Sequence, residues 1–217
     1  MNKIVVLAMA FLLLTCQSKE NKIASEVSLT KEEQITKDFA AFKANFIDAM
    51  WELNPISASY QGVHKYDAEL PIPNEERKQA SLAFSKEWLK KLKAFDYESL
   101  NDNDKIDFHL IEDDLSASEF YTQKFKQGEW DPSSYNLGGA FFQVINYQKH
   151  SLEKRLEDID LKLDKVEEYY TQAKQNIQKP TEVHSNLAIS VLSSISLQPQ
   201  TFLEKLLSSI SSSPALL

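Results

Sequence analysis

Four histidines and 32 acidic residues are the side chains of this chain that could carry out acid–base or metal chemistry. A zinc hydrolase needs two or three imidazoles and a carboxylate around one ion, with a position left open for water. His109 and Glu112, and likewise His150 and Glu153, are three residues apart, which places each pair on one face of a helix. The H-E-x-x-H pattern does not occur, and pairs of this spacing arise freely on solvated acidic helices. We therefore predict no metal site and no catalytic residue within this chain.

Nucleophilic and phosphate-binding chemistry have no better support. The sequence has no G-x-S-x-G elbow. Gly138-Gly139 is not followed by the Lys-Ser or Lys-Thr of a phosphate-binding loop. The formal charge is -8, and no basic cluster interrupts it, so nucleic acid is excluded as an expected partner.

The N-terminal segment predicts export and lipid anchoring. Residues 1–15 hold one Lys and an apolar run from Ile4 to Leu14, which is too short for a permanent membrane span and typical of a signal peptide. Cys16 is the only cysteine and lies where a bacterial lipoprotein is cleaved and acylated. We expect two or three acyl chains, such as palmitate, on Cys16, because one chain alone anchors only marginally. The alternative is an ordinary signal peptide with an incidental cysteine.

The location follows from that anchor. Residues 16–28 comprise the acylated Cys16 and a polar, unpatterned stretch that we interpret as a flexible tether. We expect the protein in the bacterial cell envelope, held by lipid at the outer membrane or the periplasmic face. With Cys16 acylated, the mature chain has no thiol for a disulfide, so its fold must rest on core packing.

Regular apolar spacing predicts an all-α fold for residues 29–217. Only four glycines occur in the chain, and 26% of its residues are charged, which favours helices over a turn-rich β fold. We expect successive helical hairpins in one bundle-like array that is incomplete on its C-terminal side. The predicted helices begin at Thr30, at Asn74 and near Asn103, occupy Ser151–Gln178 as one helix or a broken pair, and resume after Pro180 and near Pro199, whereas Gln127–Gly139 is predicted as a long loop.

The stretch from Trp51 to Pro71, WELNPISASYQGVHKYDAELP, is a corner between the first two long helices. Asn54-Pro55 ends the first helix, because the residue before proline is pushed out of the α region. Pro55 can open a short helix that Gly62 closes. This local geometry explains most of the stretch, but it does not require Tyr66 and Asp67 beside His64.

The same corner resembles the pattern N-P-x-x-A-[T/S]-x-x-G-x-x-x-Y-D-x-x-L-P of the bacterial domain-of-unknown-function family 885. Three later stretches agree in order: NDNDKIDFHLI, SSYNL and LEKRLEDIDLKLDKVEEYYTQAKQNIQKP. The residues that carry the match at the corner are Asn54, Pro55, Ala58, Ser59, Gly62, Tyr66, Asp67, Leu70 and Pro71.

Members of that family resemble exported or lipid-anchored helical proteins related to gluzincin-type zinc metallopeptidases. The resemblance therefore implies that fold here, and zinc as the cofactor of full-length members. Their His-Glu-x-x-Pro-Gly-His stretch lies downstream of every residue in this chain, so no catalytic or zinc-binding residue carries over. For the corner, the resemblance implies a packing joint or the wall of a substrate cleft.

Three hypotheses remain open. In the first, the chain is the N-terminal helical segment of a lipid-anchored, exported metallopeptidase-like protein of unknown substrate, inactive alone and packed against the missing C-terminal part of the family fold. In the second, it is a complete non-catalytic helical lipoprotein that binds a ligand or partner in the cell envelope. In the third, it is a self-sufficient peptidase that uses His64, His109 or His150, which predicts stoichiometric zinc in the purified protein.

Overall fold

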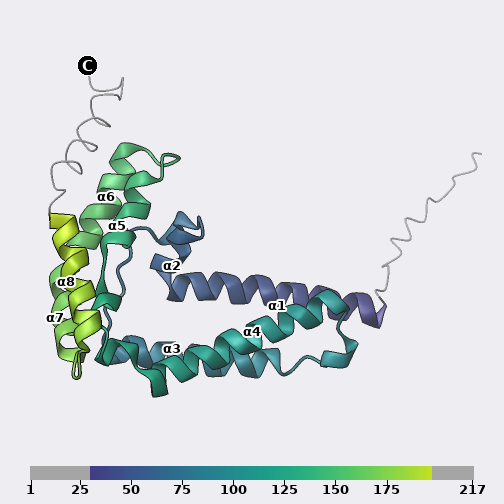
Figure 1. Ribbon diagram of the computed structural model, residues 1–217. Helices are drawn as coiled ribbons and strands as arrows, with labels where there is room; N and C mark the ends of the chain where they lie inside the picture. The colour runs from purple at the N-terminus through teal and green to yellow at the C-terminus, as the bar shows by residue number, and fades with distance from the viewer. Residues whose placement is uncertain (1–29, 197–217) are drawn as a thin grey trace, which may run out of the picture.

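The computed structural model describes residues 30–196, which form eight α-helices and no strand. The predicted all-α fold is thus confirmed. Three helices make a long arm, four shorter ones gather at one end of it, and α2 lies at the junction (Figure 1). The α-helices are α1 (Lys31–Leu53), α2 (Pro55–Tyr60), α3 (Glu75–Leu92), α4 (Asp102–Phe120), α5 (Gly138–Asn146), α6 (Leu152–Leu163), α7 (Val166–Asn176) and α8 (Glu182–Ser196).

The predicted signal peptide at 1–15, the acylation site Cys16, the tether and the helix expected near Pro199 lie outside the described residues. None of the helices within 30–196 is both long and apolar enough to cross a bilayer.

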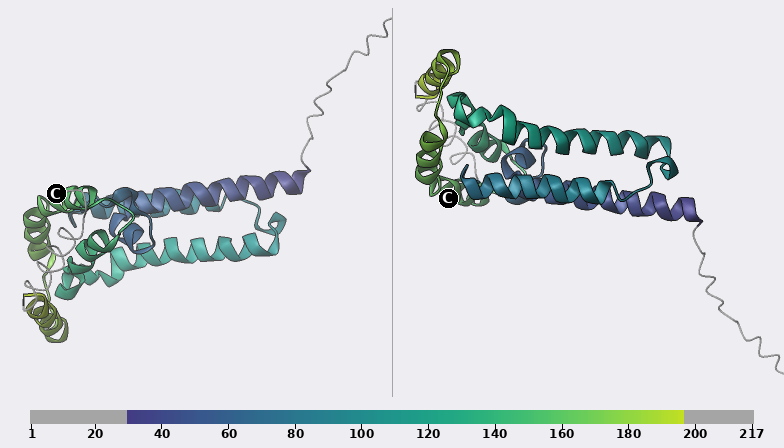
Figure 2. Two further views of the ribbon diagram at one scale, coloured as in Figure 1. Left: turned by 90° about the horizontal axis from the view of Figure 1, so that it is seen from above. Right: turned by 90° about the horizontal axis from the view of Figure 1, so that it is seen from below.

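The long arm consists of α1, α3 and α4, whose axes lie roughly along one line of the molecule (Figure 2). Helix α3 packs against α4 and α1, and the aromatic rings between them interlock, as between Phe42 and Trp88 with ring centroids 5.5 Å apart. The buried residues of this core are Phe39, Phe42, Phe46, Trp88, Leu92, Leu100, Phe108, Ile111 and Leu115.

Side-chain caps set where the helices of this arm begin. The Thr30 hydroxyl accepts a hydrogen bond from the Glu33 amide at 3.2 Å, and the Glu33 carboxylate accepts one from the Thr30 amide at 2.8 Å. This is a complete capping box. The Asn74 side chain accepts a hydrogen bond from the Arg77 amide at 2.8 Å and starts α3 in the same way. Both predicted starts are confirmed.

The corner after α1 also follows the sequence. Pro55 is the first residue of α2, and Gly62 closes the turn with a positive φ of 82°. The Arg77 guanidinium of α3 donates hydrogen bonds to the Leu53 carbonyl and, at 3.2 Å, to the side-chain oxygen of Asn54. The end of α1 is thereby fixed to the start of α3.

The region of the four short helices differs from expectation at one predicted loop and agrees with it over Ser151–Gln178. The segment predicted as a loop, Gln127–Gly139, holds two 3-10 turns, η4 (Gln127–Glu129) and η5 (Pro132–Tyr135), and the start of α5. Gly139 lets α2 approach α5 closely, because a Cβ on Gly139 would lie 1.6 Å from the Tyr60 hydroxyl. The pattern expected over Ser151–Gln178 is a broken pair, α6 and α7. A second core joins α7 to the corner and to the segment before α5; its buried residues are Leu70, Tyr135, Leu137, Tyr169 and Ala173.

Helix α6 has polar residues inside and leucines outside. Asp158 and Lys162, four residues apart, are 1% and 0% exposed. Leu156 and Leu163, which apolar periodicity places on the inner face, are 36% and 53% exposed. The side of α6 that faces the other helices is therefore the polar one.

Candidate functional site

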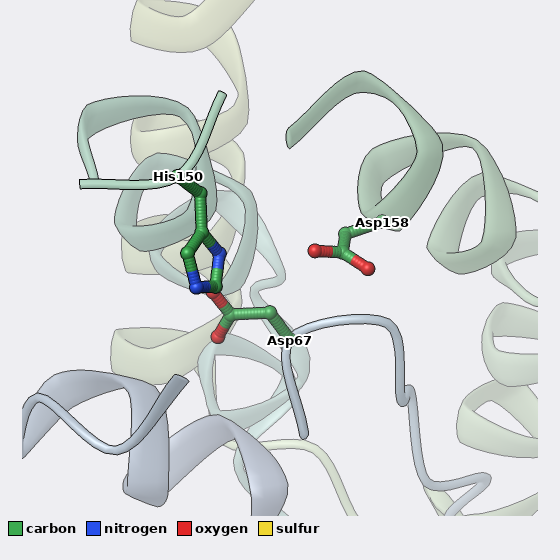
Figure 3. Close-up of side chains that lie close together, drawn as sticks. All are labelled: Asp67, His150 and Asp158. Atoms are coloured by element: carbon green, nitrogen blue, oxygen red, sulfur yellow. The ribbon is translucent and has the colours of Figure 1, made fainter. Parts of the chain in front are cut away.

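Three side chains that could bind a metal ion meet where the corner faces α5 and α6. Asp67 follows the 3-10 turn η1 (His64–Tyr66), His150 lies in the turn before α6, and Asp158 lies within α6. One ligand atom from each lies within 4.8 Å of the other two. Figure 3 shows the Asp67 carboxylate beside the His150 ring, with the Asp158 carboxylate directed toward both. We call these three residues the acidic–histidine cluster.

Asp67 is held rigidly at the base of this cluster. It is 1% exposed, and its Oδ1 accepts a hydrogen bond from the Ser59 hydroxyl at 2.5 Å. Its Oδ2 is paired with His64 Nδ1 at 2.8 Å. The His64 ring stacks on Tyr147 with a centroid separation of 3.4 Å. These contacts fix both the position and the orientation of the carboxylate.

The other two members of the cluster carry atoms without partners. Asp158 Oδ1 accepts a hydrogen bond from Lys154 Nζ at 2.5 Å, but Asp158 Oδ2 has no partner among the described residues. His150 Nδ1 is likewise buried and without a partner there. Buried polar atoms are almost always hydrogen-bonded. Two buried atoms without a partner in one cluster therefore mark a place where a ligand, an ion or a water molecule belongs.

Two lysines contribute positive charge at the edge of the cluster. Lys162 is 0% exposed, and its Nζ donates a hydrogen bond to the Ala140 carbonyl at 3.3 Å. Burial lowers the pKa of Lys162, although the negative charges of Asp67 and Asp158 oppose that shift. The hydrogen bond from Lys154 to Asp158 raises the pKa of Lys154. The ammonium of Lys162 is therefore the cation that loses its charge more readily.

Of the residues singled out at the corner, only Asp67 enters the cluster. Asn54 donates a hydrogen bond to the Met50 carbonyl at 3.0 Å and caps α1, and Pro55 is buried at the start of α2. Gly62 makes the turn, and Tyr66 and Pro71 are half-buried beside it. The contacts of these other residues are thus those of helix ends and a turn.

The two predicted histidine–glutamate pairs have different outcomes. His109 Nδ1 lies 3.6 Å from the Glu112 carboxylate on α4, where the His109 side chain is exposed. His150 instead makes ring contacts with Tyr147 and His64, and Glu153 is exposed. Sequence reasoning missed the grouping of His150 with Asp67 and Asp158, because no local spacing connects the three. The one available signal was an acid and a lysine four residues apart on α6.

A separate groove of about 360 Å³ lies in the long arm, between α1, α3 and α4. Its walls combine apolar and polar groups, including Trp51, Phe84 and Asp114. Burial raises the pKa of the Asp114 carboxyl. The size falls within the range of small-molecule sites.

One solved structure is clearly similar to this chain. It belongs to a protein from Shewanella oneidensis that is described as a candidate lipoprotein of unknown function. The two chains are 39% identical and superpose with a TM-score of 0.71. The match covers 81% of this chain and 32% of that one, so this chain spans about a third of the length of its relative.

Sequence comparison agrees with the structural match. No curated protein matches the chain. The sequence profile of a bacterial family of unknown function, DUF885, matches residues 55–213, which include most of the corner and all three residues of the cluster. The chain therefore belongs to the bacterial protein family of unknown function DUF885.

Proposed function

We propose that this chain is the N-terminal helical part of a lipid-anchored, exported protein with a metallopeptidase-like fold, and that it supplies packing surface to that fold. The observation that carries the proposal is the outward-facing apolar surface of α6 and α8. Leu156 and Leu163 share one face of α6, and Val183 and Leu187, 73% and 49% exposed, share one face of α8.

Such side chains stabilise a protein only when they are covered. Each contributes roughly 1.5–3 kcal/mol on full burial, and contiguous exposed apolar patches usually mark an interaction surface. The occupant that we propose is the remainder of the family fold, since this chain corresponds to only 32% of its solved relative. The zinc of full-length members would belong to that remainder.

The decisive test is the DNA immediately downstream of the codon for Leu217. A reading frame that continues into a His-Glu-x-x-Pro-Gly-His stretch supports the proposal. A stop codon without a second fragment nearby would refute it.

The lipid anchor is a second part of the proposal and has its own test. It is supported by the apolar run before Cys16 and by the description of the solved relative. Cells fed a palmitate analogue should label the wild-type protein in the membrane fraction, and Cys16→Ser should abolish the label. A labelled Cys16→Ser variant, or an unlabelled wild type, would contradict acylation at Cys16.

The groove in the long arm favours a second candidate function, namely a non-catalytic lipoprotein that binds a small ligand in the envelope. Its mixed walls suit a molecule with an apolar body and one polar group. Native mass spectrometry of the purified full chain should then find a co-purifying small molecule, and Ser81→Trp should exclude it by filling the groove. An empty wild-type protein would argue against this function.

A further inference from the structure

We propose that Asp67, His150 and Asp158 bind one divalent transition-metal ion, with Zn²⁺ the preferred ion, and that this ion fastens the corner to α6. The site goes beyond the packing function proposed above and is distinct from the zinc motif expected downstream. It also departs from the sequence-based prediction that no metal site forms within this chain.

The donor set fits such an ion. One imidazole nitrogen and two carboxylate oxygens are ligands that Zn²⁺ accepts, whereas Ca²⁺ and Mg²⁺ take oxygen ligands. Ligand atoms bound at about 2.0–2.2 Å in the tetrahedral geometry of zinc lie about 3.3–3.6 Å apart. The three ligand atoms lie within 4.8 Å of one another, so side-chain movements of about 1 Å would complete that geometry.

A second, independent observation points to an occupant. Asp158 Oδ2 and His150 Nδ1 are both buried and both without a partner among the described residues. Asp158 is 1% exposed, so bulk water does not satisfy its carboxylate. Both Asp67 oxygens accept one hydrogen bond each, which leaves a lone pair on each for an ion. Every member of the cluster can therefore offer a ligand atom without giving up a contact.

The residues around the cluster resemble the outer shell of a metal site. Ser59 and His64 are hydrogen-bonded to the Asp67 carboxylate, and Lys154 donates a hydrogen bond to Asp158. Contacts of this kind orient ligating side chains and strengthen metal binding. Such support is not needed by a carboxylate that faces solvent.

Nearby positive charge opposes the ion and makes its binding depend on pH. Lys162 is the buried cation whose charge is most easily lost, so we expect ion binding to displace a proton from Lys162. Affinity should accordingly rise with pH. The titratable or charged groups around the cluster come from two places. Those at the corner are His64, Asp67 and Glu69, and those before and on α6 are Tyr147, His150, Lys154, Arg155, Asp158 and Lys162.

The test is a Zn²⁺ titration of the full chain, purified in detergent and treated with a chelator. All proteins carry Cys16→Ser, because a free thiol also binds zinc. We expect one equivalent of Zn²⁺ per chain and a rise in melting temperature. Asp158→Asn and His150→Gln should each weaken binding at least about tenfold.

Matched controls come from the exposed pair in the long arm. His109→Gln and Glu112→Gln make the same chemical changes outside the cluster and should leave Zn²⁺ affinity unchanged. Lys162→Met should bind Zn²⁺ more tightly than the wild type, and its affinity should depend less steeply on pH. Equal weakening by the cluster variants and the controls would overturn the proposal.

A spectroscopic readout keeps the proposal testable if a cluster variant fails to fold. Co²⁺ added to the Cys16→Ser chain should give visible absorption bands that saturate at one equivalent and vanish when Zn²⁺ is added. If the chain shows neither such bands nor a stoichiometric Zn²⁺ equivalent, the proposal is wrong, and ordered water is the occupant of the cluster.

Discussion

Tyr169 is the buried residue whose ionisation conflicts most clearly with the folded state. It is 8% exposed in the second core, and its ring lies edge-on to Tyr135 with centroids 6.2 Å apart. Burial raises the pKa of Tyr169 to about 12, from an ordinary value of 10.0. The phenol is thus held neutral well into the alkaline range.

This shift predicts a loss of stability at high pH. The pKa of Tyr169 is higher in the folded state than in the unfolded state. The contribution of the neutral Tyr169 phenol to the free energy of unfolding is therefore fully present below pH 10 and is lost as the pH rises toward 12. A shift of this size corresponds to about 2–3 kcal/mol. Urea unfolding at pH 8 and pH 11 should show Tyr169→Phe losing less stability than the wild type. Tyr121→Phe, at a tyrosine 54% exposed, should behave like the wild type, and a protective effect there would contradict the assignment.

Gly62 has a positive φ, a backbone conformation that residues with a Cβ rarely adopt. Its φ is 82°, and a Cβ on Gly62 would meet nothing within 4 Å. The cost of Gly62→Ala is therefore backbone strain alone, about 1 kcal/mol in the free energy of unfolding. Chemical denaturation measures this, with the exposed neighbour Gln61→Ala as a control that should change stability little. Equal losses in both variants would show that the turn has no special requirement at Gly62.

At the scale of single elements, capping chemistry was the best guide to the fold. Thr30 and Asn74 were predicted as caps from residue type and spacing alone, and both make their capping hydrogen bonds. Local patterns of this kind are readable because the interacting atoms are three residues apart. The start of helix α5 was predicted as loop, because Gly138-Gly139 has the composition of a loop. The helix is stabilised by packing against α2 and α6, which are distant contacts that a local pattern does not show.

The cap of α3 provides a test at this scale. Asn74→Ala removes the acceptor for the Arg77 amide and should lower the free energy of unfolding by about 1 kcal/mol. Asn74→Asp keeps an acceptor in the same place and should retain most of the stability. If Asn74→Asp were as destabilised as Asn74→Ala, the lost stability would have a cause other than capping.

Helix α6 shows where periodicity misleads. Its leucines recur at helical spacing, but the structure turns Asp158 and Lys162 inward instead. A pattern of apolar residues identifies a face that must be covered, and it does not say which neighbour covers it. The acidic–histidine cluster was unpredictable for the same reason, since its members come from segments far apart in the chain.

Replacing the outward leucines tests whether α6 needs them in this chain. Leu156→Gln with Leu163→Gln should leave the melting temperature nearly unchanged and reduce both aggregation and the binding of a hydrophobic dye. Leu92→Gln, at a leucine 0% exposed in the long arm, should unfold the protein. A large loss of stability in the double variant would place those leucines in a core instead.

At the scale of the whole molecule, one side-chain hydrogen bond joins α7 to the start of α3. Asn176, at the end of α7, donates a hydrogen bond to the Pro73 carbonyl at 2.6 Å, and Pro73 directly precedes the cap of α3. The second core and this bond hold the short helices to the segment that leads into α3. Sequence patterns predict the helices. They do not predict a contact such as that between Asn176 and Pro73, because the two residues are far apart in the chain.

Breaking this connection should loosen one group against the other. Asn176→Ala should cost about 1–3 kcal/mol in the free energy of unfolding, because the half-buried Pro73 carbonyl loses its donor. Hydrogen exchange should quicken in α7 and leave α1 unchanged. Asn146→Ala, which removes a similar 2.8 Å bond within α5 alone, should affect exchange only locally. Uniform acceleration across both groups would mean that the molecule opens as one unit.

The length of α1 has a consequence for how the protein would stand on a surface. Its 23 residues make a rod about 35 Å long. The chain enters this rod at Thr30, at the tip of the long arm, and α5–α8 lie at the opposite end (Figure 1). A membrane that held the protein by its N-terminal segment would meet that tip first. Helix α1 would then act as a spacer, and the short helices, with the cluster inside them and the outward leucines of α6, would lie away from the lipid headgroups.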